Sequence, residues 1–240
     1  MKYISIAFGG DEDRYKCALI LATSLHRGNV IGSSHEWQLH VVMKKTSYSF
    51  TYKQLLEALG ATVHYVSVSN PLEYSLERYK IHDSPGVTRW IAVDSHYLWT
   101  PAKVQEFQHT LDAWEDSEKP IIAYKWPKMS QSKKPFAGGF FGSTTDSDIG
   151  NMHDLLREYM GTKSFVYGDD EKFLGWLTTK DEPVIDYYDE IFFAKHWPST
   201  NTLRMLSLGF SPLKFKRLVK DANEYSTSVL QSADTEEESY

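Results

Sequence analysis

Cysteine is almost absent from this chain, which has 240 residues and a single cysteine, Cys17. No disulfide can form within the chain, so nothing in the sequence calls for an oxidising compartment. Cys17 lies in the apolar stretch KCALILA, which predicts a small core residue rather than a nucleophile.

Long apolar runs are missing as well. No stretch approaches the roughly 20 apolar residues that a transmembrane helix needs. The chain begins with the alternating pattern of a strand over Lys2–Phe8, where a secretory leader would show an apolar run and a small-residue cleavage site. We therefore expect a cytoplasmic protein without a transmembrane segment.

An excess of positive charge is also missing. Lys and Arg number 26 against 32 Asp and Glu, which makes the formal net charge −6. General nucleic-acid binding usually requires a basic face, so this composition argues against it. Only local basic patches are present, such as Leu213–Lys220 (LKFKRLVK). A solvated helix face is the first interpretation of that patch, and contact with an anionic membrane or polymer is the second.

Strand and helix patterns alternate along the chain, as they do in parallel βα units. Strand patterns occur over residues 2–8, 37–43 and 90–93, from 62 onward, and in the stretches PIIAY and PFAGGFFGS. Helix patterns lie over residues 15–26, 74–82, 146–159 and 169–177, and another begins at Thr100-Pro101. We expect an α/β fold with a mixed, mostly parallel central sheet flanked by helices. One domain should cover residues 1–220, and the polar, acidic tail 221–240 should be disordered.

Ligands of open α/β sheets bind beyond the carboxyl ends of the strands. Asp94 and His96 follow the apolar strand at 90–93. Residues two apart on an extended chain point to the same side, so both can bind one cation. A carboxylate with an imidazole suits Mn²⁺ or Mg²⁺, which would bridge a diphosphate. The alternative is that Asp94 ends the strand and His96 is a loop residue.

The first strand ends at Phe8 and is followed by Gly9, Gly10 and Asp11. Glycines at this turn would let a ligand approach the backbone. Asp11 would accept hydrogen bonds from a base or ribose, and Tyr15 would stack on a base. A tight turn with a helix cap explains the same residues equally well.

Gly138 and Gly139, in AGGFFGS, nearly match a dinucleotide-binding fingerprint. The match fails because no helix pattern begins inside the glycine run. We expect instead that these glycines leave room for a sugar to lie against the backbone. Close packing within the protein is the competing explanation.

Three carboxylates, Asp169, Asp170 and Glu171, stand together where a helix is predicted to begin. Acids are favoured at a helix N-terminus, but three in a row exceed what a cap needs. They are candidates for a general base, or for a nucleophile or stabiliser of a sugar cation. Farther on, His196 beside Trp197 is expected to close over a diphosphate or bind a metal, with a surface histidine as the alternative.

Taken together, RWIAVDSHYLW (Arg89–Trp99), PFAGGFFGS and DDEKFLGWL resemble the glycosyltransferase A-fold family, and most closely its retaining blood-group A/B and alpha-galactosyl transferase type. The resemblance implies a Rossmann-like half that binds the nucleotide and a D-x-D motif that holds a divalent metal. Here Asp94-Ser95-His96 stands in place of D-x-D, and His96 replaces the second Asp. The implied roles are metal binding by Asp94, His96 and His196, nucleotide binding by Phe8, Gly9, Asp11, Tyr15 and Arg89, sugar or acceptor binding by Gly138, Gly139 and Trp197, and catalysis by Asp170, Glu171 and Asp169.

Some relatives of that type lack the acidic pair and neutralise the diphosphate with basic residues. In this chain Arg78, Lys80 and Arg89 would then take that part. The acidic residue matching Glu171 is the nucleophile or cation stabiliser in retaining relatives, whereas Asp169 or Asp170 would be the base in inverting ones.

The resemblance implies a hexosyl- or pentosyltransferase that moves a sugar from a nucleotide-diphosphate sugar to an acceptor hydroxyl. Two alternatives are a nucleotidyltransferase that makes sugar nucleotides and a non-catalytic nucleotide- or carbohydrate-binding module. The acceptor is open and includes glycans, lipid-linked sugars, proteins and modified nucleic-acid bases. A polyanionic acceptor is suggested by Lys125, Lys128, Lys133 and Lys134 around Trp126, although a solvated loop is the preferred interpretation.

Overall fold

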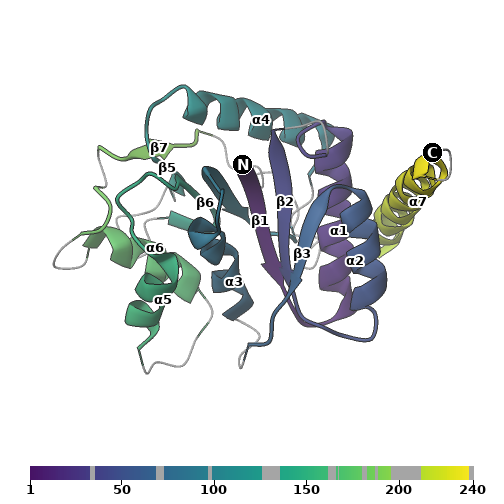
Figure 1. Ribbon diagram of the computed structural model, residues 1–240, viewed down its shortest axis with the longest axis horizontal. Coiled ribbons are helices and arrows are strands. Elements are labelled where there is room, and N and C mark those ends of the chain that lie inside the picture. Colours follow the sequence, from purple (N-terminus) through teal and green to yellow (C-terminus); the bar gives the residue numbers. More distant parts are fainter. Residues whose placement is uncertain are drawn as a thin grey trace.

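A single twisted sheet with helices packed against it forms the body of the protein (Figure 1). The structure is a computed structural model, and the residues that it describes are 1–32, 36–68, 73–96, 99–125, 136–161, 166, 168–179, 183–186, 189–195 and 212–237.

The sheet has seven strands in the order β3-β2-β1-β4-β6-β5-β7. Their bounds are β1 (Lys2–Phe8), β2 (Trp37–Met43), β3 (Ala61–Tyr65), β4 (Arg89–Val93), β5 (Ile121–Lys125), β6 (Phe136–Thr144) and β7 (Ile191–Phe193). β6 is antiparallel to both of its neighbours, whereas the other recorded strand pairs are parallel. The mixed, mostly parallel sheet is therefore confirmed, and β7 is a strand that the sequence patterns had not predicted.

Side chains alternate between two cores along β1. Ile4, Ile6 and Phe8 join the core under α1 (Glu12–Arg27), α2 (Ser49–Ala58) and α4 (Pro101–Glu115). Tyr3 points the other way, into a core shared with α5 (Met152–Met160) and α6 (Asp169–Thr179). Because successive strand residues face opposite sides, the helices cover the sheet as two layers.

α4 forms as its sequence predicts. Thr100 is the N-cap, and its hydroxyl accepts a hydrogen bond from the backbone N–H of Lys103 at 3.4 Å, with Pro101 in the first turn. The buried face of the helix is an apolar stripe that comprises Val104, Phe107, Leu111 and Trp114.

α5 begins later than predicted, at Met152 rather than near Asp146. Gly150 has φ +79°, a left-handed conformation that interrupts a helix. Asn151 then caps the helix, and both oxygens of Asp83 accept backbone N–H groups of Met152 and His153, at 2.8 and 2.9 Å. A carboxylate distant in sequence thus completes this helix start.

The expectation of a disordered tail from Asp221 is wrong as far as Glu237, because α7 runs from Pro212 to Glu237. Ala222 is 1% exposed and Ser226 is fully buried where α7 packs against α1 and α2. Arg27 of α1 donates two hydrogen bonds to Asp221, at 2.5 and 3.1 Å. The spacing of these buried positions is helical, but their small and polar side chains conceal it in the sequence.

The direction of β6 determines what lies at the carboxyl edge of β4. Val93 pairs with Phe140, so the first residues of β6 extend past the end of β4. The backbone N–H of Asp94 donates to the carbonyl oxygen of Gly139 at 3.3 Å. Across this edge lie α3 (Tyr74–Glu77) and the 3₁₀ helix η2 (Arg78–Asp83), in place of the one helix predicted at 74–82.

None of the helices in the described ranges is both long and apolar enough to cross a membrane.

Candidate active site

One buried arginine joins two of the predicted site carboxylates. The side chain of Arg78 is 2% exposed and donates from Nη1 to Asp94 Oδ1 at 2.6 Å and from Nη2 to Asp170 Oδ2 at 3.0 Å. Asp94 follows β4 and Asp170 lies in the first turn of α6, so their meeting depends on the tertiary fold. Each carboxylate keeps part of its surface in contact with solvent, at 19% and 16% of the side chain.

Gly138 and Gly139 allow these carboxylates to lie against β6. A Cβ atom on Gly139 would lie 2.3 Å from Asp94 Oδ2, and one on Gly138 would lie 2.5 Å from Asp170 Oδ2. The space beside these glycines is filled by the protein's own carboxylates. The prediction that a sugar occupies that space is therefore wrong. Close packing, the competing explanation, accounts for both glycines.

The carbonyl oxygen of Gly138 is held by two donors. Arg78 Nη2 donates to it at 2.7 Å, and the hydroxyl of the fully buried Tyr79 donates at 2.8 Å. η2 supplies both residues, since it crosses the end of β4. The start of β6 is thereby fixed beside the two carboxylates.

The cluster shifts the pKa of both Asp170 and Arg78. Burial raises the pKa of Asp170; the positive charge of Arg78 opposes that rise, while Asp94 adds to it. For Arg78, burial alone would lower the pKa, but Tyr79 and the two carboxylates outweigh it and leave the pKa raised. The arginine is therefore a cation that contacts two acids, and the pKa of one of them, Asp170, is raised.

The three neighbouring acids of α6 have different surroundings. Asp169 accepts the backbone N–H of Val166 and the ammonium group of Lys172, both at 2.8 Å, so it fastens the start of the helix. Asp169 therefore serves the start of its own helix, whereas Asp170 contacts Arg78. Glu171 is half-buried and its Cγ lies near Gly138, on the side of Asp170.

His96 follows Asp94 by two residues and is half-buried. Within the described ranges, no group of three or more His, Cys, Asp or Glu side chains is arranged to hold a metal. One oxygen of Asp94 is already bonded to Arg78. The described residues thus supply an incomplete ligand set, and a cation would need oxygen atoms from a substrate diphosphate.

At the nucleotide end, Tyr15 contradicts its predicted role. Its ring is fully buried and packs edge-on against Phe8 and Tyr48, with centroids 5.0 and 4.9 Å away. Its hydroxyl donates to the carbonyl oxygen of Lys44 at 2.6 Å. No face of this ring is open to a base, because the apolar spacing that placed Tyr15 on α1 directs it into the core.

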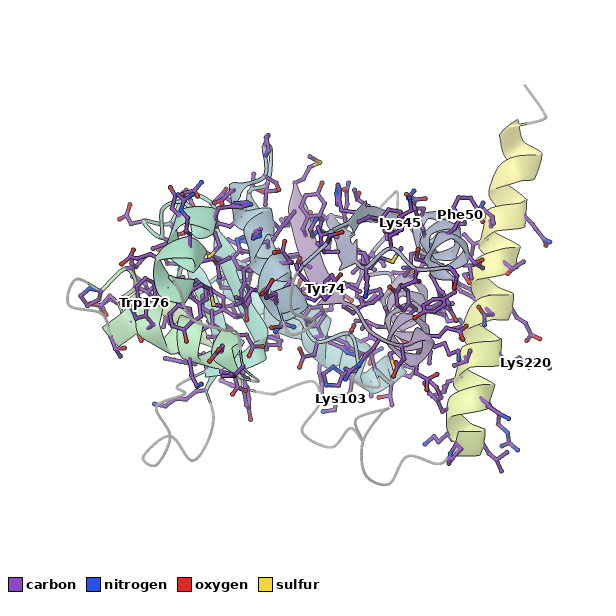
Figure 2. The ribbon with its side chains drawn as sticks, turned by 90° about the horizontal axis from the view of Figure 1, so that it is seen from below. Lys45, Phe50, Tyr74, Lys103, Trp176 and Lys220 are labelled. Atoms are coloured by element: carbon purple, nitrogen blue, oxygen red, sulfur yellow. The ribbon has the colours of Figure 1, made fainter. Side chains whose placement is uncertain are left out.

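The turn after β1 leads directly into α1. A Cβ atom on Gly9 would lie 2.4 Å from Cε2 of Tyr74, so this glycine makes room for the α3 ring. Asp11 is the N-cap of α1 but makes no capping hydrogen bond with its exposed side chain. Phe8 ends β1 with its side chain buried. Figure 2 views this edge from below and shows Tyr74 near its middle.

Arg89 lies at the wrong end of its strand for nucleotide binding. It begins β4, and Asp94 follows the strand about 16 Å farther along at the usual rise per residue. Its guanidinium group stacks over the ring of Trp114 on α4 at 4.6 Å. The prediction for Arg89 is therefore wrong, because the full length of β4 separates this residue from the edge where Asp94 lies.

Several predicted residues lie outside the described ranges, namely His196, Trp197, Trp126, Lys128, Lys133 and Lys134. Among the described residues, Tyr79 is the one whose role the sequence did not suggest. Arg78 was expected to face a diphosphate, but it is enclosed by protein carboxylates. Arg78 and Tyr79 are neighbours in a weak helix pattern, and that pattern does not predict that both side chains are buried.

Comparisons with solved structures agree with this architecture. The galactosyltransferase LgtC, in a complex with donor and acceptor sugar analogs, matches with a TM-score of 0.54 and 14% identity over 97% of this chain and 96% of LgtC. A 4-diphosphocytidyl-2C-methyl-D-erythritol synthase from Anaerococcus prevotii matches with a TM-score of 0.50 and 13% identity over 93% of this chain and 96% of the synthase.

The glycosyltransferase GlyE from Streptococcus pneumoniae matches with a TM-score of 0.50 and 14% identity. The match covers 81% of this chain and 46% of GlyE, so this chain spans about half the length of that protein. No family model matches the sequence, and no curated protein matches it. At these identities the likeness concerns architecture, and by that measure the chain has the glycosyltransferase A fold.

Proposed function

We propose that this protein transfers a sugar from a nucleotide-diphosphate donor to an acceptor hydroxyl. The observation that carries the proposal is the pair of carboxylates, Asp94 and Asp170, held on Arg78 at the carboxyl edge of the sheet. In open α/β folds this edge is where ligands bind. One acid would face the leaving diphosphate and the other the sugar carbon that reacts.

The donor would extend along this edge from β1 to β4. Asp11 is suited to the ribose or base, because its exposed carboxylate makes no capping bond. Backbone atoms near Phe8 and Gly10 would line the same end. Asp94 would face the diphosphate, with its Oδ1 fixed by Arg78.

The sugar would lie toward the start of α6. Asp170 has both oxygens engaged, by Arg78 and by the backbone N–H of Glu171 at 2.9 Å. These bonds hold the carboxylate in a position from which, when ionised, it would stabilise a sugar cation. Glu171 is the candidate nucleophile of a retaining reaction, and Asp170 is the candidate base of an inverting one. The anomeric form of the product, read by NMR, distinguishes the two.

A divalent cation, Mn²⁺ or Mg²⁺, is part of the proposal. Such cations often bind through one or two protein carboxylates together with substrate phosphates. Among the described residues, Asp94 and His96 are the candidate ligands, and the bound cation would neutralise charge on the leaving group. The acceptor class is a glycan or another hydroxyl compound, including a modified nucleic-acid base, and a cytoplasmic location is proposed with it.

Thermal unfolding with and without Mn²⁺ tests donor binding. A panel of nucleotide-diphosphate sugars should contain at least one that raises Tm, because a ligand at 100 times its Kd stabilises the folded state by about 2.7 kcal/mol. Asp94→Asn should reduce that shift, whereas Asp112→Asn, on α4, should not. If no nucleoside diphosphate or its sugar raises Tm, the proposal fails.

The second candidate is a nucleotidyltransferase, which the match to the diphosphocytidyl synthase supports over 93% of this chain. It would join a nucleoside triphosphate to a sugar phosphate and release pyrophosphate. Against it stands the acidic loop FGGDEDRY after β1, where such enzymes usually have a basic glycine-rich loop. Pyrophosphate release from a nucleoside triphosphate would favour this candidate over sugar transfer.

The variants Asp170→Asn and Glu171→Gln distinguish a non-catalytic binding module from the two candidate enzymes. Transfer or hydrolysis of the donor sugar should fall at least tenfold in one of these variants while donor binding persists. Absence of any turnover in the wild-type chain, with donor binding intact, would favour the binding module.

A further inference from the structure

Two histidines lie side by side on a part of the sheet that the proposed sugar-transfer site does not use. His40 is on β2 and His64 is on β3, and their ring centroids are 5.1 Å apart with planes tilted by 44°. They lie on the sheet face opposite α1 and α2, because His40 contacts Ser5 and Tyr3 on that face of β1. β3 is three strands from β4, about 14 Å at the usual strand spacing.

His40 is arranged as a metal-binding histidine usually is. The residue is 8% exposed, and its Nδ1 lies 3.0 Å from the hydroxyl oxygen of Ser5. When Nδ1–H donates to Ser5, the lone pair of Nε2 is available to a metal ion, and such outer hydrogen bonds typically orient metal-binding histidines.

The separation of the two rings suits a shared ion. Two imidazoles on one metal at about 2.0–2.1 Å have their centroids about 4.5–5.2 Å apart for angles between square and tetrahedral. The observed 5.1 Å lies within that interval. His64 is exposed, so an ion can approach from solvent.

We propose that His40 and His64 together bind one divalent transition-metal ion of the Zn²⁺ or Ni²⁺ type, with water in the other positions. Imidazole nitrogen selects these ions, whereas the carboxylates near Arg78 suit Mg²⁺ or Mn²⁺. No third His, Cys, Asp or Glu joins the pair among the residues that the structure describes. The site therefore has two protein ligands, and water fills the other positions around the ion.

Titration of the full chain with Ni²⁺ at pH 7.5 tests the proposal. Because Ni²⁺ is paramagnetic, the ring signals of His40 and His64 should broaden before those of the other seven of the nine histidines in ¹H–¹⁵N spectra. Calorimetry should show that His64→Ala weakens Ni²⁺ and Zn²⁺ binding at least tenfold. His109→Ala, on the exposed face of α4, is the matched control and should leave binding unchanged.

Both substituted side chains are exposed, so neither variant opens a cavity in the core. Equal metal affinity in wild type and His64→Ala would overturn the proposal. Earlier broadening of a different pair of histidines would overturn it too. Equal affinity in the two proteins does not bear on sugar transfer, since Asp94 and Asp170 are unchanged in both.

Discussion

At the residue scale, Arg78 is the side chain on which the candidate site depends. Its guanidinium group contacts Asp94, Asp170 and the Gly138 carbonyl, which belong to three separate elements. An arginine offers several donors in a fixed plane, so one side chain can hold all three at once. A lysine has a single ammonium group in place of the planar guanidinium group, so it would not hold all three partners in this arrangement.

Removing this charge should destabilise the protein strongly. Arg78→Met would leave two carboxylates close together without a cation, and breaking a buried ion pair in this way costs about 3–5 kcal/mol. Urea unfolding measures the loss. The double variant Arg78→Met/Asp170→Asn should recover part of it, because one uncompensated charge is gone.

The control is Arg89→Met, which removes a half-buried guanidinium stacked on Trp114 but spares the carboxylates. Its loss should be about 1 kcal/mol, the scale of a cation–π contact. Equal losses in the two single variants would contradict the central role of Arg78.

Protonation of Asp170 should make stability depend on pH with a definite sign. The pKa of Asp170 is raised above its ordinary value of 3.8, so the folded state binds the proton more tightly than the unfolded state does. This contribution to stability is present below pH 3.8 and is lost as pH rises through the folded pKa. Asp170→Asn cannot ionise, so its Tm relative to wild type should rise between pH 4 and pH 7.

Asp83 provides a control of opposite sign. Burial would raise its pKa, but His153 and the backbone N–H groups of α5 outweigh burial and lower it. Its contribution is present above pH 3.8 and is lost as pH falls through the folded pKa. The loss of Tm in Asp83→Asn should therefore shrink as pH falls below 3.8, and parallel pH curves for the two variants would refute the assignment.

At the element scale, α7 is the helix whose docking the sequence conceals. Ala222 is 1% exposed on its inner face, and Tyr225 shares a hydrogen bond of 2.9 Å with His26 of α1. Arg27 also stacks over the Tyr225 ring at 4.3 Å. Figure 1 shows this helix along the side of the molecule formed by α1 and α2.

A charge on the inner face of α7 should release the helix. In Ala222→Asp, an unpaired carboxylate would be buried against α1 and α2, at a cost of several kcal/mol. Amide hydrogen exchange should then accelerate in α7 before it accelerates in β1. Thr227→Asp, at an exposed position of the same helix, should exchange like wild type. Similar exchange in both variants would mean that α7 does not dock.

At the scale of the whole molecule, two cores share one sheet. Antiparallel pairing of β4 with β6 continues the hydrogen-bonded ladder from β3, β2 and β1 to β5 and β7. Trp114 belongs to one core and Trp90 to the other. Since both cores rest on the same strands, neither can lose its packing without exposing the sheet.

We therefore expect one cooperative unfolding transition. Native-state hydrogen exchange of Leu39, in β2, and Ile122, in β5, should report the same free energy of global opening, within about 1 kcal/mol. Both residues are fully buried in strands. A markedly lower value for Ile122 would show that the β6 side opens by itself.

Much of this architecture follows from local patterns in the sequence. The strand at Trp37–Met43, the capped helix at Pro101 and the buried run before Asp94 depend on short-range spacing of apolar residues, so the sequence alone predicts them. The mostly parallel α/β fold follows from their alternation.

Tertiary structure decided which polar residues meet. Asp94, Asp170 and Gly138 come together because β6 runs antiparallel to β4, which no local pattern reveals. Burial of Arg78 and Tyr15, and the placement of Arg89 at the far end of its strand, likewise depend on packing between distant segments. Sequence spacing states which side of an element a residue occupies, but only the packed fold determines what lies against that side.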